Sequence, residues 1–321
     1  MSLFDLPQDD ETPPSVSSPV PVAPLDLSNR QGLHVVGIGG PGMSAIGIAL
    51  AEMGHDVSGS DLRDRAVLDR VRASGASVHI GHDRELVHGV DAVTASTAVP
   101  DLNIELDEAR QVGITVLRRA GMLASICAQA KSLAVAGTHG KTTTTSMLML
   151  MLAEANLRPS FIIGGDVTDI GTGAHWSGSE WLVVEADESD GTHVELPLYG
   201  TILTNVEVDH LDHHGSFDGI KNSFDRYLAQ VPGPKVVPSW AVQFTPKNGE
   251  VDATDQVPAA VSRVPVTSLN EPTKAPAGER MLNVALLMSA ACRLAAPAAN
   301  ATAVAITDFL IIWMLLKFFL I

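Results

Sequence analysis

The stretch that decides the fold is Ser132-Leu133-Ala134-Val135-Ala136-Gly137-Thr138-His139-Gly140-Lys141-Thr142-Thr143-Thr144. An apolar strand enters a glycine turn, after which a lysine and hydroxyl residues open a helix. Glycines let backbone N–H groups face an anion, and the N-terminus of the helix adds partial positive charge. The pattern predicts a variant phosphate-binding loop, because Val135 stands where the common form has a glycine. We therefore expect this chain to bind a nucleoside triphosphate.

Composition favours a protein that handles small molecules. The chain has 321 residues, a formal net charge of −16 and 45% hydrophobic residues. Such an acidic chain is poorly suited to a phosphate backbone, so we predict no nucleic-acid partner. Its two cysteines, Cys127 and Cys292, lie in alanine-rich stretches and are expected to be free thiols in a reducing compartment.

The two ends of the chain differ from the rest in composition. Residues 1–30 are acidic and rich in proline and serine, and they lack the features of a signal peptide, so we expect a disordered tail on a cytoplasmic protein. Residues 301–321 form an apolar tail, of which the strongly apolar part, 309–321, has only 13 residues. Because a membrane-spanning helix needs roughly 20 residues, membrane association is not expected.

Strand and helix patterns alternate along the chain, which predicts an α/β fold with two consecutive doubly wound parallel-sheet domains. We assign residues 31–131 to a Rossmann-like domain and 132–300 to a phosphate-loop ATPase domain, in which the periodicity fades after about residue 237. The expected strands lie at 33–36, within 54–61 after a turn, and at 77–80, 92–96, 115–117, 132–136, 161–163, 181–184 and 200–204.

A second glycine motif opens the first domain. Gly37-Ile38-Gly39-Gly40-Pro41-Gly42 satisfies the dinucleotide fingerprint, and Asp61 ends the second strand, where a ribose-binding acid should stand. Taken alone, the motif would suggest a nicotinamide oxidoreductase. The phosphate loop of the following domain argues against that alternative, because a dehydrogenase does not need one.

Two polar clusters follow strands of the second domain. Glu185-Ala186-Asp187-Glu188-Ser189-Asp190 comes after the strand at 181–184, and Asn205-Val206-Glu207-Val208-Asp209-His210 comes after the strand at 200–204. Ligands bind at the carboxyl ends of parallel strands, so both clusters should lie beside the phosphate loop. Carboxylates are ligands that Mg²⁺ prefers, although an acidic cluster can also cap a solvated turn.

The segment Gly137–Thr144 resembles the ATP loop of the Mur ligases, which build the peptide stem of bacterial cell-wall precursors. The form with His139 is typical of the branch that joins L-alanine to UDP-N-acetylmuramate. The resemblance runs from about residue 34 to about residue 237 and returns faintly between about 278 and 309.

This resemblance implies that the first domain binds a UDP-sugar and not NAD. Gly39-Gly40-Pro41-Gly42-Met43-Ser44 is similar to the family's N-terminal motif, whose backbone contacts the diphosphate, and the uridine would lie near Ser60 and Asp61. The candidate UDP-sugar-binding residues are Gly37, Gly39, Gly40, Gly42, Met43, Ser44, Ser60, Asp61, Ser96 and Thr97.

The resemblance also implies an ATP-dependent ligase that uses Mg²⁺ and makes an acyl phosphate of UDP-N-acetylmuramate, which the amino group of L-alanine then attacks. The candidate ATP-binding residues are Gly137, Thr138, His139, Gly140, Lys141, Thr142, Thr143 and Asn283. The candidate catalytic residues are Lys141, Glu185, Asn205 and His210, and the candidate metal ligands are Thr142, Glu185 and His210. Lys141 should face the phosphates and not the core, so we expect Lys141→Ala to abolish ATP binding and to change stability little.

The sequence departs from the family in one large respect. Mur ligases carry a third α/β domain that holds the amino-acid site, and nothing in this sequence corresponds to it. We therefore expect a truncated ligase. The alternatives are a non-catalytic remnant that binds a nucleotide and a UDP-sugar, and a related Mur ligase that acts on a peptide.

Overall fold

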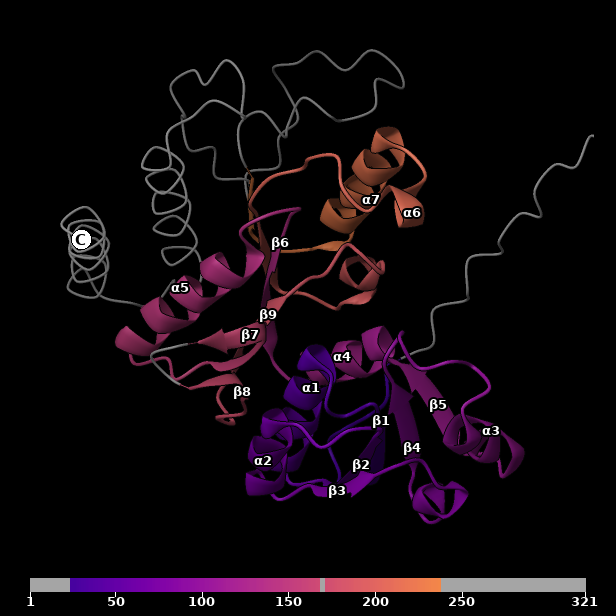
Figure 1. The fold of residues 1–321 in the computed structure, drawn as a ribbon. Coiled ribbons are helices and arrows are strands. Elements are labelled where there is room, and N and C mark those ends of the chain that lie inside the picture. Colours follow the sequence, from indigo (N-terminus) through magenta and orange to yellow (C-terminus); the bar gives the residue numbers. More distant parts are fainter. Residues whose placement is uncertain (1–23, 168–170, 238–321) are drawn as a thin grey trace, which may run out of the picture.

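The structure, a computed structural model, describes residues 24–167 and 171–237. Two sheets follow one another along the chain, and helices flank them (Figure 1). Asn283, residues 1–23 and the C-terminal tail lie outside the described residues, so the expectations for them stay predictions. Residues 24–30, which were expected to belong to the disordered tail, pack instead on the first domain, where Leu27 is buried and the Leu25 N–H donates to Ser125 Oγ at 2.8 Å. Among the described residues, no helix is long and apolar enough to cross a membrane.

The first sheet has five strands in the order β3-β2-β1-β4-β5, all parallel, as the alternating pattern predicts. Its strands are β1 (Gly32–Val36), β2 (Asp56–Asp61), β3 (Ser77–Ile80), β4 (Ala92–Ala95) and β5 (Thr115–Arg118). Its helices are α1 (Pro41–Glu52), α2 (Ala66–Ala73), α3 (Ile104–Gln111) and α4 (Arg119–Cys127), with a short 3₁₀ helix, η1 (Arg84–Val87).

Local sequence explains where two of these helices begin. Pro41 starts α1, at a position where its missing N–H costs nothing. Asn103 caps α3, since its side-chain oxygen accepts from the backbone N–H of Glu105 at 2.9 Å.

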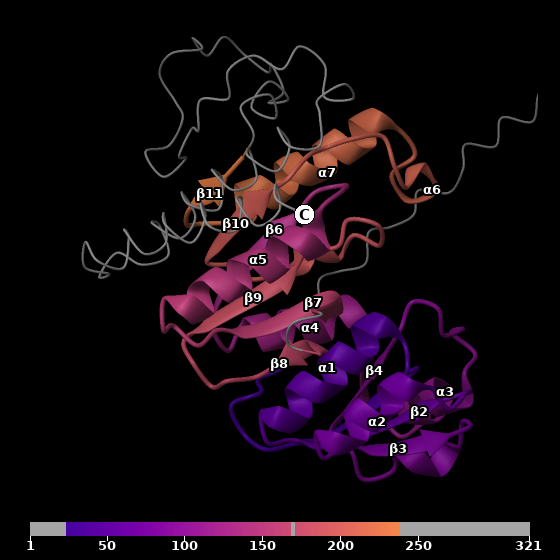
Figure 2. The same ribbon diagram turned by 60° about the vertical axis from the view of Figure 1, so that its left-hand side comes forward.

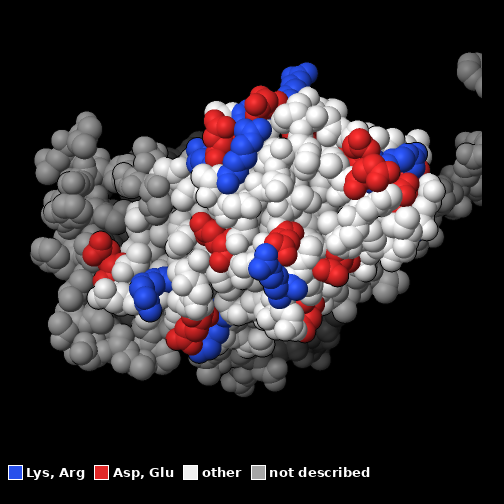
Figure 3. Space-filling view, turned by 90° about the horizontal axis from the view of Figure 1, so that it is seen from below, with Lys and Arg blue, Asp and Glu red and all other residues white. Residues whose placement is uncertain are grey.

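Figure 3, which looks at the molecule from below, shows acidic and basic side chains beside one another on this face. Within the first domain, Arg84 Nη1 lies 3.2 Å from Asp107 Oδ2 and from Glu108 Oε2.

The second sheet has six strands in the order β11-β10-β6-β9-β7-β8. Its strands are β6 (Lys131–Ala136), β7 (Ser160–Val167), β8 (Thr172–His175), β9 (Trp181–Glu185), β10 (Gly200–Leu203) and β11 (Lys235–Val236). Its helices are α5 (Lys141–Glu154), α6 (Leu211–His214) and α7 (Phe217–Gln230), with a 3₁₀ helix, η2 (Thr192–Glu195).

Neither edge strand of this sheet, β8 or β11, was expected from the sequence. β8 pairs antiparallel with β7, whereas the other strand pairs of the sheet are parallel. Thr172-Gly173-Ala174-His175 has neither an apolar run nor alternation, so its pattern gives no strand signal.

Helix α1 belongs to the first domain and lies between the two domains. It packs on the β1–β2 side of its own domain and also against β7 and β8 of the second domain (Figure 2). Residues 43–50 of α1 are all buried. A helix buried on every side lies within a core and not on a surface. Apolar residues of both domains, among them Leu50, Ile162 and Ala174, form one continuous buried cluster.

Candidate functional site

The phosphate loop connects β6 to α5 and contains two glycines with positive φ. Gly137 has φ 127° and Gly140 has φ 80°, values that residues with a side chain rarely adopt. A Cβ on Gly137 would stand 2.8 Å from the carbonyl oxygen of Asn205, whereas a Cβ on Gly140 would meet open space. Gly140 also precedes the first turn of α5, whose N–H groups can receive an anion.

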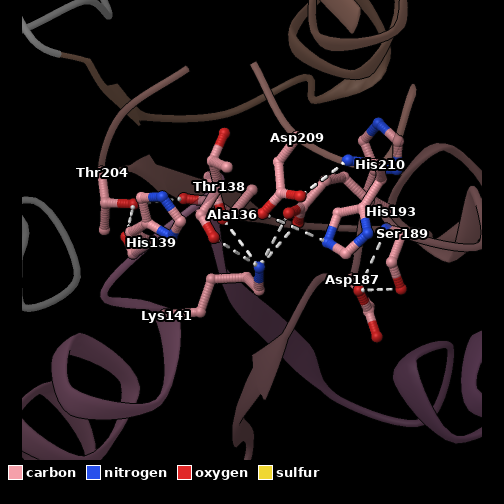
Figure 4. A network of polar contacts seen from close by, with 12 residues as sticks. Ala136, Thr138, His139, Lys141, Asp187, Ser189, His193, Thr204, Asp209 and His210 are labelled. Carbon is pink, nitrogen blue, oxygen red and sulfur yellow. Dashed lines mark hydrogen bonds and ion pairs between the residues drawn. The ribbon is translucent and has the colours of Figure 1, made fainter. Parts of the chain in front are cut away.

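Lys141 lies over this loop and contacts an acid (Figure 4). Its Nζ donates to the carbonyl oxygens of Gly137 at 2.8 Å and Thr138 at 3.3 Å. The same nitrogen lies 2.9 and 2.8 Å from the two carboxylate oxygens of Glu188. The lysine that was expected to meet phosphate is therefore paired within the protein, and a nucleotide would have to take over these contacts.

Asn205 and Thr204, which follow β10, hold the loop in shape. The amide group of Asn205 accepts from the backbone N–H of His139 and donates to its carbonyl, both at 2.9 Å. The Thr204 hydroxyl donates to the same carbonyl at 2.7 Å. Asn205 thus contacts the phosphate loop, as its place after a neighbouring strand predicts, and it acts there on the backbone of His139.

Glu185 ends β9 beside the loop, and its surroundings suit a hard cation. Its carboxylate hydrogen-bonds with the Thr142 side chain and with the backbone N–H of Gly164. Burial raises the pKa of Glu185 despite these bonds and the charge of Lys141. Its buried Oε1 has no hydrogen-bond partner. A buried, unpaired oxygen next to a threonine hydroxyl fits the coordination of Mg²⁺, which takes few protein ligands and completes its shell with phosphate and water.

The third candidate metal ligand, His210, contacts Asp209. It adopts φ 49° at the start of α6, its backbone N–H donates to Asp209 Oδ1 at 2.8 Å, and its Nε2 is 3.7 Å from Asp209 Oδ2. The part of the chain that the structure describes contains no cluster of three or more histidine, cysteine, aspartate or glutamate side chains placed to hold a metal. The grouping that the structure does make is Glu185 with Thr142.

The acidic loop after β9, Asp187-Glu188-Ser189-Asp190, also contacts Arg119 of the first domain. Arg119 Nη1 lies 3.4 Å from Asp187 Oδ2 and 3.3 Å from Asp190 Oδ2. Burial alone would raise the pKa of Asp187, but hydrogen bonds from Ser189 and the charges of Arg119 and Lys141 hold it below its usual range. This contact across the domains could not be seen in the sequence alone.

The glycine turn of the first domain is held by the residue expected to bind ribose. Asp61 Oδ2 accepts from the backbone N–H of Gly39 at 2.9 Å, and Oδ1 accepts from that of Arg63 at 3.1 Å. A Cβ on Gly39 would stand 2.7 Å from Asp61 Oδ2, so the turn needs glycine there. Both carboxylate oxygens of Asp61 are thus engaged with the backbone, and its contact to a ligand stays a prediction.

Ser60 belongs to a buried polar cluster that the sequence did not reveal. Its hydroxyl donates to Glu105 Oε2 at 2.6 Å and lies 3.1 Å from His82 Nδ1. Glu105 is fully buried. Burial would raise the pKa of Glu105, but His34, whose Nε2 lies 3.5 Å from Oε2, and hydrogen bonds from Ser60 and the Asp83 N–H keep it below its usual range.

The remaining candidates line the edge of the first domain or a cavity between the domains. Thr97 is exposed, and the Ser96 hydroxyl accepts from the backbone N–H of Ala98 at 3.2 Å. The cavity has a volume of about 420 Å³. It is lined by Gly39 and Ser44 on one side, by Gly164, Gly165 and Thr172 on the other, and by Arg65 of the first domain.

Comparison with known proteins agrees with this architecture. Residues 32–131 match the Mur ligase family, catalytic domain, and residues 135–240 match the Mur ligase middle domain. The two domains, in this order, cover both sheets and the two glycine loops. The chain belongs to the Mur ligase family.

Individual relatives carry ligase names. The UDP-N-acetylmuramate–L-alanine ligase of Rhodopseudomonas palustris strain TIE-1 is 45% identical over 200 residues, which are 62% of this chain and 43% of that protein. The enzyme of the same name from Acidothermus cellulolyticus is 47% identical over 209 residues, 65% of this chain and 44% of that protein. The chain therefore spans less than half the length of these curated relatives.

Two solved structures share the fold. The UDP-N-acetylmuramate:L-alanyl-γ-D-glutamyl-meso-diaminopimelate ligase from Neisseria meningitides superposes with a TM-score of 0.62 at 28% identity and covers 67% of this chain and 74% of that one. The UDP-N-acetylmuramate-alanine ligase MurC from Thermotoga maritima gives a TM-score of 0.60 at 28% identity, over 65% of this chain and 49% of that one.

Proposed function

We propose that these two domains bind a UDP-sugar and MgATP and serve the ATP-dependent ligation of L-alanine to UDP-N-acetylmuramate, a step of peptidoglycan precursor synthesis. One observation carries the proposal. The cavity between the domains joins Gly39, in the glycine turn, to Gly164, whose backbone N–H binds Glu185 beside the phosphate loop. A ligand held by its diphosphate at the first turn of α1 would therefore extend toward the second domain's nucleotide site.

The reaction that fits this arrangement begins with phosphoryl transfer. A carboxylate oxygen of UDP-N-acetylmuramate attacks the γ-phosphorus of ATP, the bond to the bridging oxygen breaks, and an acyl phosphate and ADP result. The amino nitrogen of L-alanine then attacks the acyl carbon, a tetrahedral intermediate forms, and phosphate leaves as the amide forms and the nitrogen loses a proton. Phosphoryl transfer of this kind depends mainly on positioning and on neutralising charge.

The residues of the second domain have distinct parts in that step. The N–H groups at the start of α5 would receive the phosphates, and Lys141 would exchange Glu188 for phosphate oxygens. Mg²⁺ would neutralise charge between the β- and γ-phosphates, and Thr142 and Glu185 are the residues that would hold it. Asn205 would keep the loop in its phosphate-binding shape through His139. His210 and Asp209 would lie on the substrate side. Because ATP is available in the cytoplasm, the proposal places the chain there.

Positional isotope exchange tests the phosphoryl-transfer step by itself. ATP labelled with ¹⁸O in the β,γ-bridge would be incubated with the full chain and Mg²⁺, with and without UDP-N-acetylmuramate. Scrambling of the label into the non-bridging β-positions, dependent on UDP-N-acetylmuramate, is the expected result. Formation of UDP-N-acetylmuramoyl-alanine on adding L-alanine would establish the second step. Tight binding of both ligands without exchange would favour a non-catalytic binding protein and overturn the proposal.

A further inference from the structure

Arg119 occupies the space between the two glycine-loop sites. It is the first residue of α4 in the first domain, and its guanidinium lies against Gly42 in the first turn of α1. A Cβ on Gly42 would stand 3.1 Å from Arg119 Nε. The other side of the same guanidinium contacts the acidic loop of the second domain, through Nη1. One side chain thus contacts both the diphosphate turn and the loop that follows Glu185.

The acidic loop is shaped to present two oxygens to this arginine. Asp187 Oδ1 accepts from the backbone N–H of Ser189 at 3.0 Å and from its hydroxyl at 2.8 Å. Asp190 Oδ1 accepts from the backbone N–H of Thr192 at 3.0 Å. The Oδ2 atoms of both aspartates remain for Arg119 Nη1, and these are the atoms that it contacts.

The same loop also contacts the nucleotide site. Glu188, between the two aspartates, is the acid that pairs with Lys141 of the phosphate loop. The carboxylate of Glu188 is buried, with 2% of its surface exposed, so its position depends on the backbone on either side of it. A continuous series of contacts therefore runs from Gly42 through Arg119 and the acidic loop to Lys141.

We propose that Arg119 couples the two ligand sites, so that a UDP-sugar bound at the glycine turn raises the affinity of the phosphate loop for MgATP. The inference rests on the proposed function and assigns to Arg119 a positioning role in it. A guanidinium has five donors in a fixed plane and can bind phosphate and carboxylate oxygens at once. Nη1 serves the aspartates, and the Nε edge lies toward the turn where the diphosphate would bind.

The direction of the coupling follows from the geometry. The ion pairs of Arg119 are long, 3.3 and 3.4 Å, and its side chain is 22% exposed, so the acidic loop is held weakly before a ligand arrives. An anion at Gly42 would compete with Asp187 and Asp190 for the guanidinium and draw it toward the glycine turn. The loop that carries Glu188 would then be held less firmly, so Glu188 would release Lys141 to the phosphates more easily. By linkage, MgATP must tighten UDP-sugar binding by the same factor.

A binding cycle tests the coupling. The dissociation constant of a non-hydrolysable MgATP analogue would be measured by calorimetry on the full chain, with and without saturating UDP-N-acetylmuramate. We expect tightening of about fivefold or more in the natural chain, the usual lower range for coupled sites. In Arg119→Ala the two constants should be equal within error. Arg119→Lys should recover little of the coupling, because an ammonium group is a compact point charge that cannot fork between partners.

Glu52 supplies the matched control. It also joins the domains, since its Oε2 accepts from the backbone N–H of Trp176 at 2.6 Å and contacts His175 Nδ1 at 3.0 Å, but it belongs to neither glycine loop. Glu52→Gln should loosen the interface and leave the coupling factor unchanged. Equal coupling in the natural chain and in Arg119→Ala would overturn the role of Arg119. Loss of the coupling in both Arg119→Ala and Glu52→Gln would overturn it as well. Failure of the natural chain to bind either ligand would overturn the proposed function and this inference with it.

Discussion

Lys141 and Glu188 form a buried ion pair at the phosphate loop, with Nζ 2.8 and 2.9 Å from the two carboxylate oxygens. Only 16% of the lysine side chain and 2% of the glutamate side chain are exposed. Lys141 was expected to face the phosphates, so that its removal would change stability little; the pairing with Glu188 gives a reason to expect a larger effect. Without the lysine, a carboxylate would remain buried with no charge partner.

We predict that Lys141→Met lowers the free energy of unfolding by about 3–5 kcal/mol, the usual cost of leaving one member of a buried ion pair without its partner. The double variant Lys141→Met/Glu188→Gln should regain most of that loss, since neither charge is then buried. Urea denaturation monitored by circular dichroism measures both. Nucleotide binding should be lost in both variants. Equal stability of the natural chain and the single variant would show that the pair does not persist in solution.

Gly137→Ala and Gly140→Ala should differ sharply in effect. Both glycines have positive φ, but only Gly137 is crowded, with a Cβ 2.8 and 2.9 Å from backbone atoms of Asn205. Backbone cannot move aside as a flexible side chain can, so we expect Gly137→Ala to cost about 3 kcal/mol. Gly140→Ala, which meets open space, should cost about 1 kcal/mol from strain alone. Thermal denaturation of the two variants checks the order, and equal costs would contradict the crowding argument.

Acid should destabilise the chain through His193. Burial, followed by the nearby charges of His214 and Arg226, lowers the pKa of His193 to about 4. An unfolded histidine has a pKa near 6.5, so between about pH 6.5 and 4 the unfolded state binds the proton more readily. Stability should therefore fall as the pH falls through this window, by about 3 kcal/mol in total.

His193→Gln should flatten that part of the pH profile, because the amide does not titrate and can still bond to Ser223. His88, which is exposed, is the control of opposite sign. Its hydrogen bond to Glu108 raises its pKa, so His88 stabilises the fold at low pH and His88→Gln should not flatten the profile. The urea concentration at the midpoint of unfolding, measured from pH 7 to pH 4 for the natural chain and both variants, checks this prediction. A slope unchanged in His193→Gln would mean that other groups govern acid sensitivity.

Glu185→Gln should weaken the Mg²⁺-dependent part of nucleotide binding. The amide retains the size of the side chain but removes the charge that faces the Thr142 hydroxyl, and carboxylates are preferred by Mg²⁺ over amides. We expect a loss of roughly tenfold or more in affinity for the nucleotide with Mg²⁺, and little change with EDTA present. Glu180→Gln, which breaks only the exposed pair with Lys131, is the control. An equal effect of Glu185→Gln with and without Mg²⁺ would remove Glu185 from the metal site.

Much of the arrangement could be predicted from the sequence because it depends on local signals. Apolar runs such as Leu133–Ala136 mark the central strands, and polar residues at their ends meet because parallel strands end at one edge of the sheet. In this way Glu185 comes to Thr142, and Asn205 comes to His139. The chemical roles of these residues remain predictions.

What could not be predicted depends on contacts between distant segments. The side chains of Arg119 and Asp190 are 71 positions apart along the chain, and their pairing follows from how the two domains pack. Glu105 looks in sequence like an ordinary acid in the first turn of a helix, yet it is fully buried beneath Ser60 and His82. Strand β8 has no strand pattern in its sequence. Its pairing with β7 and its packing on α1 hold it in place, and neither contact can be seen in the sequence.

The burial of α1 on all sides means that the boundary between domains is not a boundary between cooperative folding units. Pulling the domains apart would expose Ala45 and Ile48 on the cavity side of the helix, together with Ala174 across from them. Units that share a hydrophobic core lose it together, so opening one should remove support from the other. The described part of the chain should unfold in a single transition, although its two sheets belong to two distinct family domains.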